Sequence, residues 1–462
     1  MSTVGRCGGP GRTPSVDLAA AEGPQPPGGV VMARHDGTPR TDGRKQSWHR
    51  RGAAGVTALS LAVGVAATMM TGPADATPVD QKPANQDQNQ RLAAIADQTV
   101  AAGTPGLIVR VDDGHGPVKT IVRQAAWSRK DHILAADDEF RMASNTKTVT
   151  ATLILQLVAE HRVKLSDSIE KWLPGLVPNG QNITLRMLLN HTSGLDDFAY
   201  DPEALALMTG QVDELPTAQE VLAIGTKRPV LFAPGKGWSY SNTGYIALGL
   251  VLEKATGHSL ADLVQQRIAR PLGMKNTYLS TAVPSHHTRP AAHGYEPDAT
   301  HLAPILPPGT PEGFGFVGPT RNEHVDVTAI NQSWNGAAGA IVSTASDWAR
   351  FDQSLMSGRL VPEPLLNEMR VVVPEDDSDG PGRSYGLGLE KIQTPCGTVW
   401  GHDGALPGYQ SDNYTDLSGK RTVSVLSTTH FGLMTDPETG AAEDALVNAA
   451  ICTMLDKPIP AG

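Results

Sequence analysis

Clustered basic charge is the first thing that the sequence lacks. Its 462 residues hold 38 Lys and Arg against 48 Asp and Glu, so the formal net charge is −10, and no basic stripe offsets that balance. Proteins that bind nucleic acid neutralise phosphates with clustered Lys and Arg. We therefore expect no nucleic-acid partner.

The composition also lacks the excess of Gly and Pro that marks a fibrous or low-complexity chain. The 48 Gly and 35 Pro together stay below the roughly 25–30% at which such chains are expected. With 40% hydrophobic and 19% charged residues, the sequence predicts a globular protein that is long enough to enclose a site within a large core.

The first 76 residues indicate export rather than a folded element. A basic stretch, R-K-Q-S-W-H-R-R at 44–51, precedes an uncharged run from 52 to 72, and A-D-A follows at 74–76. This order is typical of a secretory signal. We expect residues 1–76 to form a disordered extension and a signal peptide, cleaved after Ala76, and the mature protein to be secreted. A retained membrane anchor is the weaker alternative, because the run is rich in Ala, Gly and Thr. The polar residues 77–90 are expected to be a linker.

Cysteine is scarce, with three residues in the chain. Cys7 lies in the segment that export would remove, which leaves Cys396 and Cys452 as an even pair in an oxidising compartment. Such a pair predicts a disulfide, with two buried thiols as the alternative. Neither C-x-x-C nor H-E-x-x-H occurs and the 14 His are scattered, so we expect no metal and no cofactor.

Hydrophobic patterns suggest how residues 91–462, expected to be one domain, are organised. A helix-like stretch up to about residue 102 precedes a β-hairpin, helical spacing prevails from residue 144 to about residue 275, and a last helix is expected at about 441–455. The β-type runs lie at 106–111, 118–123, 398–400 and 421–428. The predicted fold class is α+β: an antiparallel sheet flanked by N- and C-terminal helices, with an inserted α-rich region.

Ser144 and Lys147 form an S-x-x-K pair at the start of a long apolar stretch. On a helix this spacing puts the hydroxyl and the amine on one face, within reach for proton transfer. Ser168 and Lys171 match the same pattern, so the spacing alone decides nothing. A buried helix after Ser144 would desolvate Lys147 and lower its pKa, whereas the second pair lies in a polar, surface-type run. We therefore predict that Ser144 is a nucleophile.

Further elements follow the S-x-x-K pair in a fixed order. They are H-T-S-G-L at 191–195, Y-S-N at 240–242, Y-G-L-G-L at 385–389 and H-D-G at 402–404. The ordered set resembles the serine β-lactamase and penicillin-binding (DD-peptidase) family, which includes class C β-lactamases, secreted DD-peptidases, esterases and D-aminopeptidases. The resemblance covers about residues 90–456 and implies a β-lactamase/transpeptidase-like fold.

That resemblance implies catalysis through an acyl-enzyme. Ser144 would attack a carbonyl after losing its proton to Lys147 or to the phenolate of Tyr240, and Tyr240 would then protonate the leaving amine. Asn242 would hydrogen-bond the substrate and Lys147. His402 would take the electrostatic role of the Lys in K-T-G enzymes.

Residues beside His402 are expected to complete the substrate-binding site. The backbone N–H groups of Ser144 and Ala405 would hold the oxyanion, next to Gly404. Asp403 is expected to raise the pKa of His402, which would then act as an imidazolium. If His402 proves structural, Lys391 is the first candidate for binding a substrate carboxylate.

Within the family, H-x-G preceded by a Cys resembles secreted D-alanyl-D-alanine carboxypeptidases, which implies peptidoglycan stem peptides as substrates, acylation by β-lactams and a monomer. Two departures leave other activities open. Asp403 replaces a hydroxyl residue, and Glu390 then Lys391 follow Y-G-L-G-L, where an Arg can bind the substrate carboxylate. An esterase or D-aminopeptidase-type hydrolase, a β-lactamase and a silent cell-wall binding protein remain alternatives.

Overall fold

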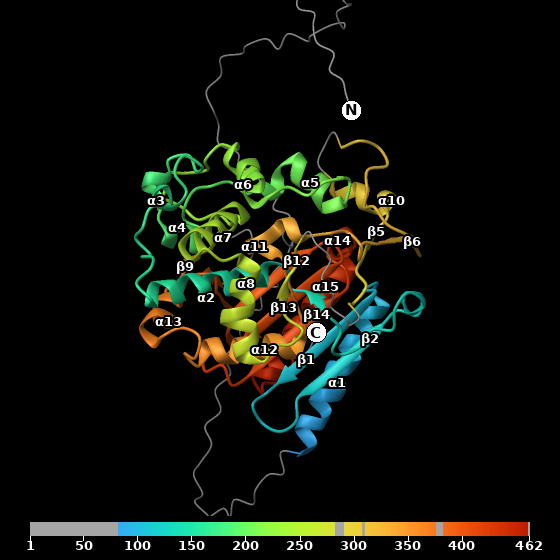
Figure 1. The fold of residues 1–462 in the computed structure, drawn as a ribbon. Helices are drawn as coiled ribbons and strands as arrows, with labels where there is room; N and C mark the ends of the chain where they lie inside the picture. Colours follow the sequence, from blue (N-terminus) through green and yellow to red (C-terminus); the bar gives the residue numbers. More distant parts are fainter. Residues whose placement is uncertain (1–81, 282–290, 307–309, 376–381, 461–462) are drawn as a thin grey trace, which may run out of the picture. The chain divides into compact units, whose positions relative to one another are not determined.

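The computed structural model describes residues 82–281, 291–306, 310–375 and 382–460 (Figure 1). The predicted signal segment lies outside these residues. Helix α1 (Lys82–Ala101) occupies most of the segment that we predicted to be a linker, and that prediction is wrong from residue 82 onward. Residues 85–90 are polar but contain neither Gly nor Pro, so nothing stops the helix around Leu92 from extending toward the N-terminus.

An antiparallel sheet of eight strands forms the centre of the described fold. Its order is β2-β1-β14-β13-β12-β11-β10-β9, so the N-terminal hairpin pairs with the last strand of the chain. The strands are β1 (Gly106–Asp112), β2 (Lys119–Gln124), β9 (Val373–Pro374), β10 (Arg383–Tyr385), β11 (Glu390–Thr394), β12 (Gly397–Leu406), β13 (Tyr409–Thr415) and β14 (Thr422–Ser427). The predicted α+β fold class is confirmed.

Side chains of β1 alternate between two hydrophobic layers. Leu107 and Val109 pack in one core with α1 and α15 (Pro437–Met454), whereas Ile108 belongs to the larger core shared with the α-rich region. In Figure 1 the green helices of that region gather on one side of the sheet, and the blue α1 lies on the other. Because successive side chains of a strand point to opposite faces of the sheet, the sheet separates two cores.

The α-rich region lies between β3 (Phe140–Arg141) and β4 (Tyr278–Leu279), as the helical spacing predicted. Gly257, with φ 74°, ends α7, and Ser259 caps α8 by accepting a hydrogen bond from the backbone N–H of Asp262. Its helices are α2 (Thr146–Ala159), α3 (Ile169–Trp172), α4 (Leu185–Leu189), α5 (Pro202–Thr209), α6 (Ala218–Thr226), α7 (Asn242–Thr256), α8 (Leu260–Val264) and α9 (Arg270–Leu272).

The remaining elements connect this region to the end of the sheet. Strands β3 and β4 flank β8 in one small sheet, and β7 lies between β5 and β6 in another. These elements are β5 (Tyr295–Pro297), β6 (Thr320–Arg321), β7 (His324–Asp326), β8 (Ile341–Ser343), α10 (Ala299–Leu302), α11 (Gly336–Gly339), α12 (Ala345–Met356), α13 (Glu363–Met369) and α14 (Phe431–Thr435).

A disulfide ties the sheet to the last helix. Cys396, in the turn before β12, is bonded to Cys452 of α15, with 5.2 Å between the Cα atoms. The predicted pairing is confirmed. Among the helices of the described residues, none has both the length and the hydropathy of a membrane span.

Candidate functional site

Ser144 lies in a 3-10 turn, Ala143–Asn145, that leads directly into α2. Ala143 has a φ of 48°, a left-handed conformation that a non-glycine residue adopts only where its surroundings enforce it. Strand β12 packs against this turn at Gly404, where an added Cβ atom would clash with the carbonyl oxygen of Met142 and lie 2.9 Å from the backbone nitrogen of Ser144. Glycine at 404 therefore allows the strand to approach the Ser144 amide.

The amine of Lys147 lies 2.9 Å from the Ser144 hydroxyl oxygen, one turn along α2. It also donates to Asn242 Oδ1 at 2.6 Å and to the carbonyl oxygen of Ala338 at 2.8 Å. Complete burial lowers the pKa of Lys147 to about 7, although the charge of Asp197 opposes the shift. A neutral amine has two N–H donors and one lone pair. Because the two carbonyl oxygens can only accept, the lone pair is left for the proton of Ser144.

Tyr240 closes the other side of the Ser144 hydroxyl. Its side chain is hydrogen-bonded to Ser144, and its ring centroid lies 4.8 Å from Lys147 Nζ. Desolvation of the phenol raises the pKa of Tyr240 well above its usual range. Of the two bases that we considered, the geometry therefore favours the Lys147 amine over a Tyr240 phenolate.

Asn242 is oriented by a carboxylate that the sequence analysis missed. Its amide nitrogen donates to Asp197 Oδ2 at 2.7 Å, which directs Oδ1 toward Lys147. Asp197 is 4% exposed, and its other oxygen accepts from the backbone N–H of Ala199. Burial raises its pKa against these hydrogen bonds. Two adjacent Asp residues after H-T-S-G-L gave no sign of this role.

His402 is present at the site, but not in the expected state. It is 2% exposed, its Nδ1 faces the carbonyl oxygen of Asp403, and its Nε2 lies 2.8 Å from the Tyr385 hydroxyl. A carbonyl only accepts, so Nδ1 carries the proton and Nε2 accepts from Tyr385. Burial lowers the pKa of His402 to about 3, and the opposing field of Asp403 is too weak to restore it. The expectation of a raised pKa and an imidazolium is wrong.

Asp403 takes part in an ion-pair network around a cation that the sequence analysis also missed. Arg383 Nη2 lies 3.1 Å from Asp403 Oδ1 and 2.7 Å from Glu390 Oε2, and its Nε lies 3.3 Å from Glu375 Oε2. Burial and the neighbouring carboxylates raise the pKa of Glu390 well above its usual value. Among the described residues, Glu390, His402 and Asp403 could bring three ligand atoms near one metal ion. Since Arg383 bonds both carboxylates, the cluster suits a guanidinium.

The sequence model of the β-lactamase family matches residues 89–448.

The chain belongs to the β-lactamase family.

That family comprises serine hydrolases of the β-lactamase and penicillin-binding type, which take small acyl substrates and β-lactams. Penicillin-binding protein 4* of Bacillus subtilis (strain 168) is 30% identical over 306 residues, 64% of this chain and 61% of that protein. The chain thus spans less than two thirds of that relative's length.

Two solved structures resemble this β-lactamase-family protein over most of its length. A D-stereospecific amidohydrolase from Streptomyces sp. has a TM-score of 0.62 at 33% identity, covering 74% of this chain and 94% of that one. The D-amino acid amidase from Ochrobactrum anthropi SV3, complexed with L-phenylalanine, has a TM-score of 0.67 at 29% identity, covering 79% and 98%.

The remaining predicted residues of this β-lactamase-family site separate into two groups. Ala405 follows Gly404 on β12 and pairs with Gln410, so its backbone lies beside the Ser144 turn. Lys391 instead pairs with Trp400, and its amine lies 5.8 Å from the centroid of that ring. Among the described residues, Lys391 is thus placed beside Trp400 and has no contact with the Ser144 hydroxyl.

The second S-x-x-K pair lies on the surface, as its polar context indicated. Ser168 is the N-terminal cap residue of α3, and Lys171 forms an ion pair with Asp167 at 2.8 Å with half of its side chain exposed. That lysine is half exposed and ion-paired, whereas Lys147 is fully buried. The structure thus distinguishes the two pairs by burial.

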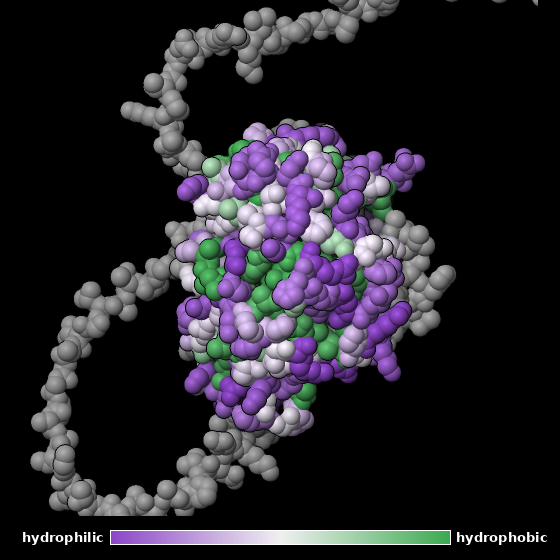
Figure 2. All heavy atoms as spheres, turned by 60° about the vertical axis from the view of Figure 1, so that its left-hand side comes forward, coloured by the Kyte–Doolittle hydropathy of each residue, from purple (hydrophilic) through white to green (hydrophobic). Residues whose placement is uncertain are grey.

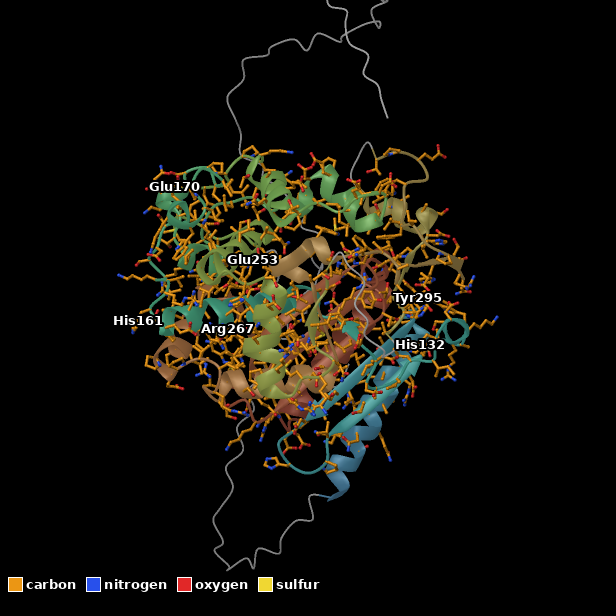
Figure 3. All side chains as sticks on the ribbon, viewed as in Figure 1. His132, His161, Glu170, Glu253, Arg267 and Tyr295 are labelled. Atoms are coloured by element: carbon orange, nitrogen blue, oxygen red, sulfur yellow. A yellow bond between two sulfur atoms is a disulfide. The ribbon has the colours of Figure 1, made fainter. Side chains whose placement is uncertain are left out.

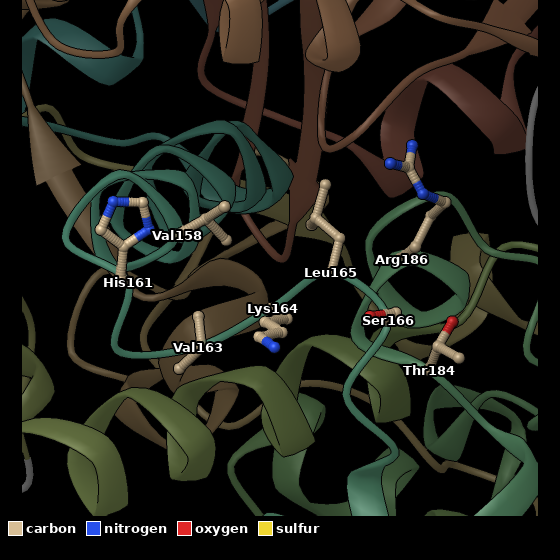
Figure 4. Close-up of a pocket in the computed structure, with 8 residues that line it drawn as sticks. All are labelled: Val158, His161, Val163, Lys164, Leu165, Ser166, Thr184 and Arg186. Atoms are coloured by element: carbon tan, nitrogen blue, oxygen red, sulfur yellow. The ribbon is translucent and has the colours of Figure 1, made fainter.

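A cavity of 470 Å³ lies away from this site, at the far end of α2 (Figure 4). Its lining residues are Val158, His161, Val163, Lys164, Leu165, Ser166, Thr184 and Arg186. The face that carries α2 and α13 is shown in Figure 2, where hydrophilic side chains surround an apolar area. None of the lining residues contacts Ser144, so we assign this cavity no part in the reaction.

Proposed function

We propose that this protein hydrolyses amide bonds of small D-configured substrates through an acyl-enzyme on Ser144. The observation that carries the proposal is the buried Lys147 amine, 2.9 Å from the Ser144 hydroxyl and held there by Asn242 and Ala338. The resemblance to a D-stereospecific amidohydrolase and a D-amino acid amidase supports the choice of bond and configuration.

In this mechanism Lys147 takes the proton of Ser144 as the hydroxyl attacks the substrate carbonyl. The oxyanion that forms would accept from the backbone N–H groups of Ser144 and Ala405, each worth about 3 kcal/mol in the transition state. Tyr240, which stays a phenol, would pass a proton to the leaving nitrogen. Water would then hydrolyse the ester at Ser144 and regenerate the hydroxyl.

Charge around the site favours substrates without a carboxylate at the leaving end. Asp403 and Glu375 outnumber the single guanidinium of Arg383, even with Glu390 protonated. His402 is neutral, and Lys391 lies over Trp400. An anionic substrate would approach a net negative cluster, whereas an amino acid amide carries an ammonium group and no carboxylate.

D-Alanyl-D-alanine carboxypeptidase, acting on peptidoglycan stem peptides, is the second candidate. The H-D-G motif at 402–404 and the similarity to penicillin-binding protein 4* favour it. An esterase or a β-lactamase would use the same acyl-enzyme and differ in which acyl group is released fastest.

One parallel assay distinguishes these activities. Purified enzyme is given D- and L-phenylalanine amide, a D-Ala-D-Ala peptide, nitrocefin and a p-nitrophenyl ester, with Ser144→Ala as the control for contaminating activity. We expect the highest kcat/KM for the D-amide, about tenfold or more above its L-form. A higher kcat/KM for the D-Ala-D-Ala peptide would overturn the proposed substrate class and support the carboxypeptidase.

We also propose that the protein acts outside the cytoplasm. A disulfide persists in oxidising compartments, and Cys396 and Cys452 form one. N-terminal sequencing of the exported protein should find a chain that begins after Ala76, and an intact N-terminus in the cytoplasmic fraction would contradict the proposal.

A further inference from the structure

His191 holds the backbone on both sides of Tyr240. Its carbonyl oxygen accepts from the N–H of Ser239 at 3.1 Å, and its ring Nδ1 accepts from the N–H of Ser241, also at 3.1 Å. The residue that contributes the phenol is thus fixed from its two chain neighbours by a single histidine.

The conformation of His191 is specific to this arrangement. Its φ is 62°, in the left-handed region that few residues other than Gly and Asn adopt readily. The side chain is 1% exposed, and Nε2 has no hydrogen-bond partner among the described residues. Because Nδ1 accepts, Nε2 carries the proton. A second proton, on Nδ1, would face the N–H of Ser241 and break this hydrogen bond. Burial also lowers the pKa of His191 well below its usual value.

The ring of His191 contacts side chains from the other elements of the site. Its centroid lies 4.4 Å from that of Tyr240 and 4.5 Å from that of Tyr385, whose hydroxyl donates to His402. These contacts connect H-T-S-G-L, Y-S-N and H-D-G through a single imidazole.

We infer that His191 is a positioning residue that fixes the Tyr240 phenol against Ser144, through the hydrogen bond from Ser241 to Nδ1. The inference rests on the proposed acyl-enzyme mechanism and adds a residue that does not itself touch the reacting atoms. A structural histidine would contribute to stability and leave the reaction of the folded enzyme unchanged.

Two substitutions separate these roles. His191→Asn keeps an acceptor near the position of Nδ1 and tolerates a left-handed backbone. His191→Phe keeps an aromatic ring beside Tyr240 and Tyr385 but leaves the Ser241 N–H without its acceptor. Because Nε2 makes no hydrogen bond in the described structure, the Phe variant loses this one hydrogen bond; its left-handed backbone is strained as well, so Tm and circular dichroism first establish that it folds.

The matched control is Tyr295→Phe. Tyr295 is a buried aromatic residue whose hydroxyl lies 3.1 Å from Asp131 Oδ2, in a different part of the fold, where Figure 3 labels it near His132. This variant also loses a buried hydrogen bond, but none of its contacts reaches the site.

For each variant, the rate constant of acylation by a penicillin and by a p-nitrophenyl ester is measured and normalised to titrated active sites. Tm, kcat and KM are measured on the same preparations. We expect about a tenfold or greater loss in His191→Phe, mainly in kcat, since a buried donor is left unpaired. His191→Asn should recover most of that loss, and Tyr295→Phe should match the wild type. Equal normalised rates in His191→Phe and wild type, with lower Tm, would overturn the inference alone. A folded wild type that neither reagent acylates would overturn the proposed function, and this inference with it.

Discussion

The hydroxyl of Tyr385 donates a hydrogen bond to Nε2 of His402, with 2.8 Å between the two atoms. The other ring nitrogen faces the carbonyl oxygen of Asp403, so both nitrogens are satisfied by a neutral imidazole. The third motif of this protein therefore contributes no positive charge, in contrast to the lysine of K-T-G enzymes to which it was compared.

Replacing His402 by Gln tests that neutrality. Gln carries no charge and offers an acceptor to the Tyr385 hydroxyl, so kcat/KM at neutral pH should stay within about threefold of wild type. Steady-state kinetics with the best amide or ester substrate measures this. A loss of about a hundredfold or more in His402→Gln, with activity retained in His402→Lys, would instead point to an imidazolium that acts through its charge.

Activity should depend on pH through Lys147. The amine acts as a base when neutral, and burial holds its pKa at about 7, so kcat/KM should fall about tenfold for each pH unit below that value. The pH profile of the wild type and of Lys171→Ala, a control in the exposed S-x-x-K pair, should coincide. A profile that falls as the pH rises through neutrality would contradict this assignment.

Asp197 should matter because it orients Asn242. Asp197→Ala leaves the Asn242 amide nitrogen without its acceptor and frees the amide to turn its oxygen away from Lys147. We expect kcat/KM to fall by about tenfold or more. Asp197→Asn, which retains an accepting oxygen, should recover part of the loss. The neighbouring Asp196 pairs with Arg228, so Asp196→Asn is the control, and an equal effect there would refute a specific role for Asp197.

The disulfide should stabilise the fold without serving the reaction. Its two cysteines are 56 residues apart, and replacing both Cys396 and Cys452 by Ser should lower the free energy of unfolding by roughly 2–4 kcal/mol. Urea unfolding of the wild type, with and without a reductant, and of the double variant measures this. Unchanged midpoints in all cases would show that the bridge contributes nothing to stability.

Much of the site could be predicted because its motifs carry local geometry. S-x-x-K at the start of a buried helix specifies both the Ser144 to Lys147 distance and the desolvation that lowers the lysine pKa. The hairpin and the Cys396 to Cys452 pairing were predicted from equally local or paired signals.

The wrong or missing predictions concern properties that depend on packing between distant segments. The adjacent Asp403 carboxylate suggested a raised pKa for His402. Burial instead lowers that pKa, and the hydrogen bond from Tyr385 on another strand suits a neutral imidazole. No motif marks Asp197 or Arg383: Asn242 lies 45 residues after Asp197, and Asp403 lies 20 residues after Arg383. Helix α1 began earlier than expected because polar residues without Gly or Pro are compatible with a helix.

Covalent labelling of Ser144 tests the central claim most directly. Folded wild type is incubated with a penicillin, digested, and mapped by mass spectrometry, beside Lys147→Ala and Lys171→Ala. The account predicts one adduct, on the peptide that contains Ser144, formed about a hundredfold or more slowly in Lys147→Ala and at the wild-type rate in Lys171→Ala. An adduct on Ser168, or none on the folded wild type, would contradict it.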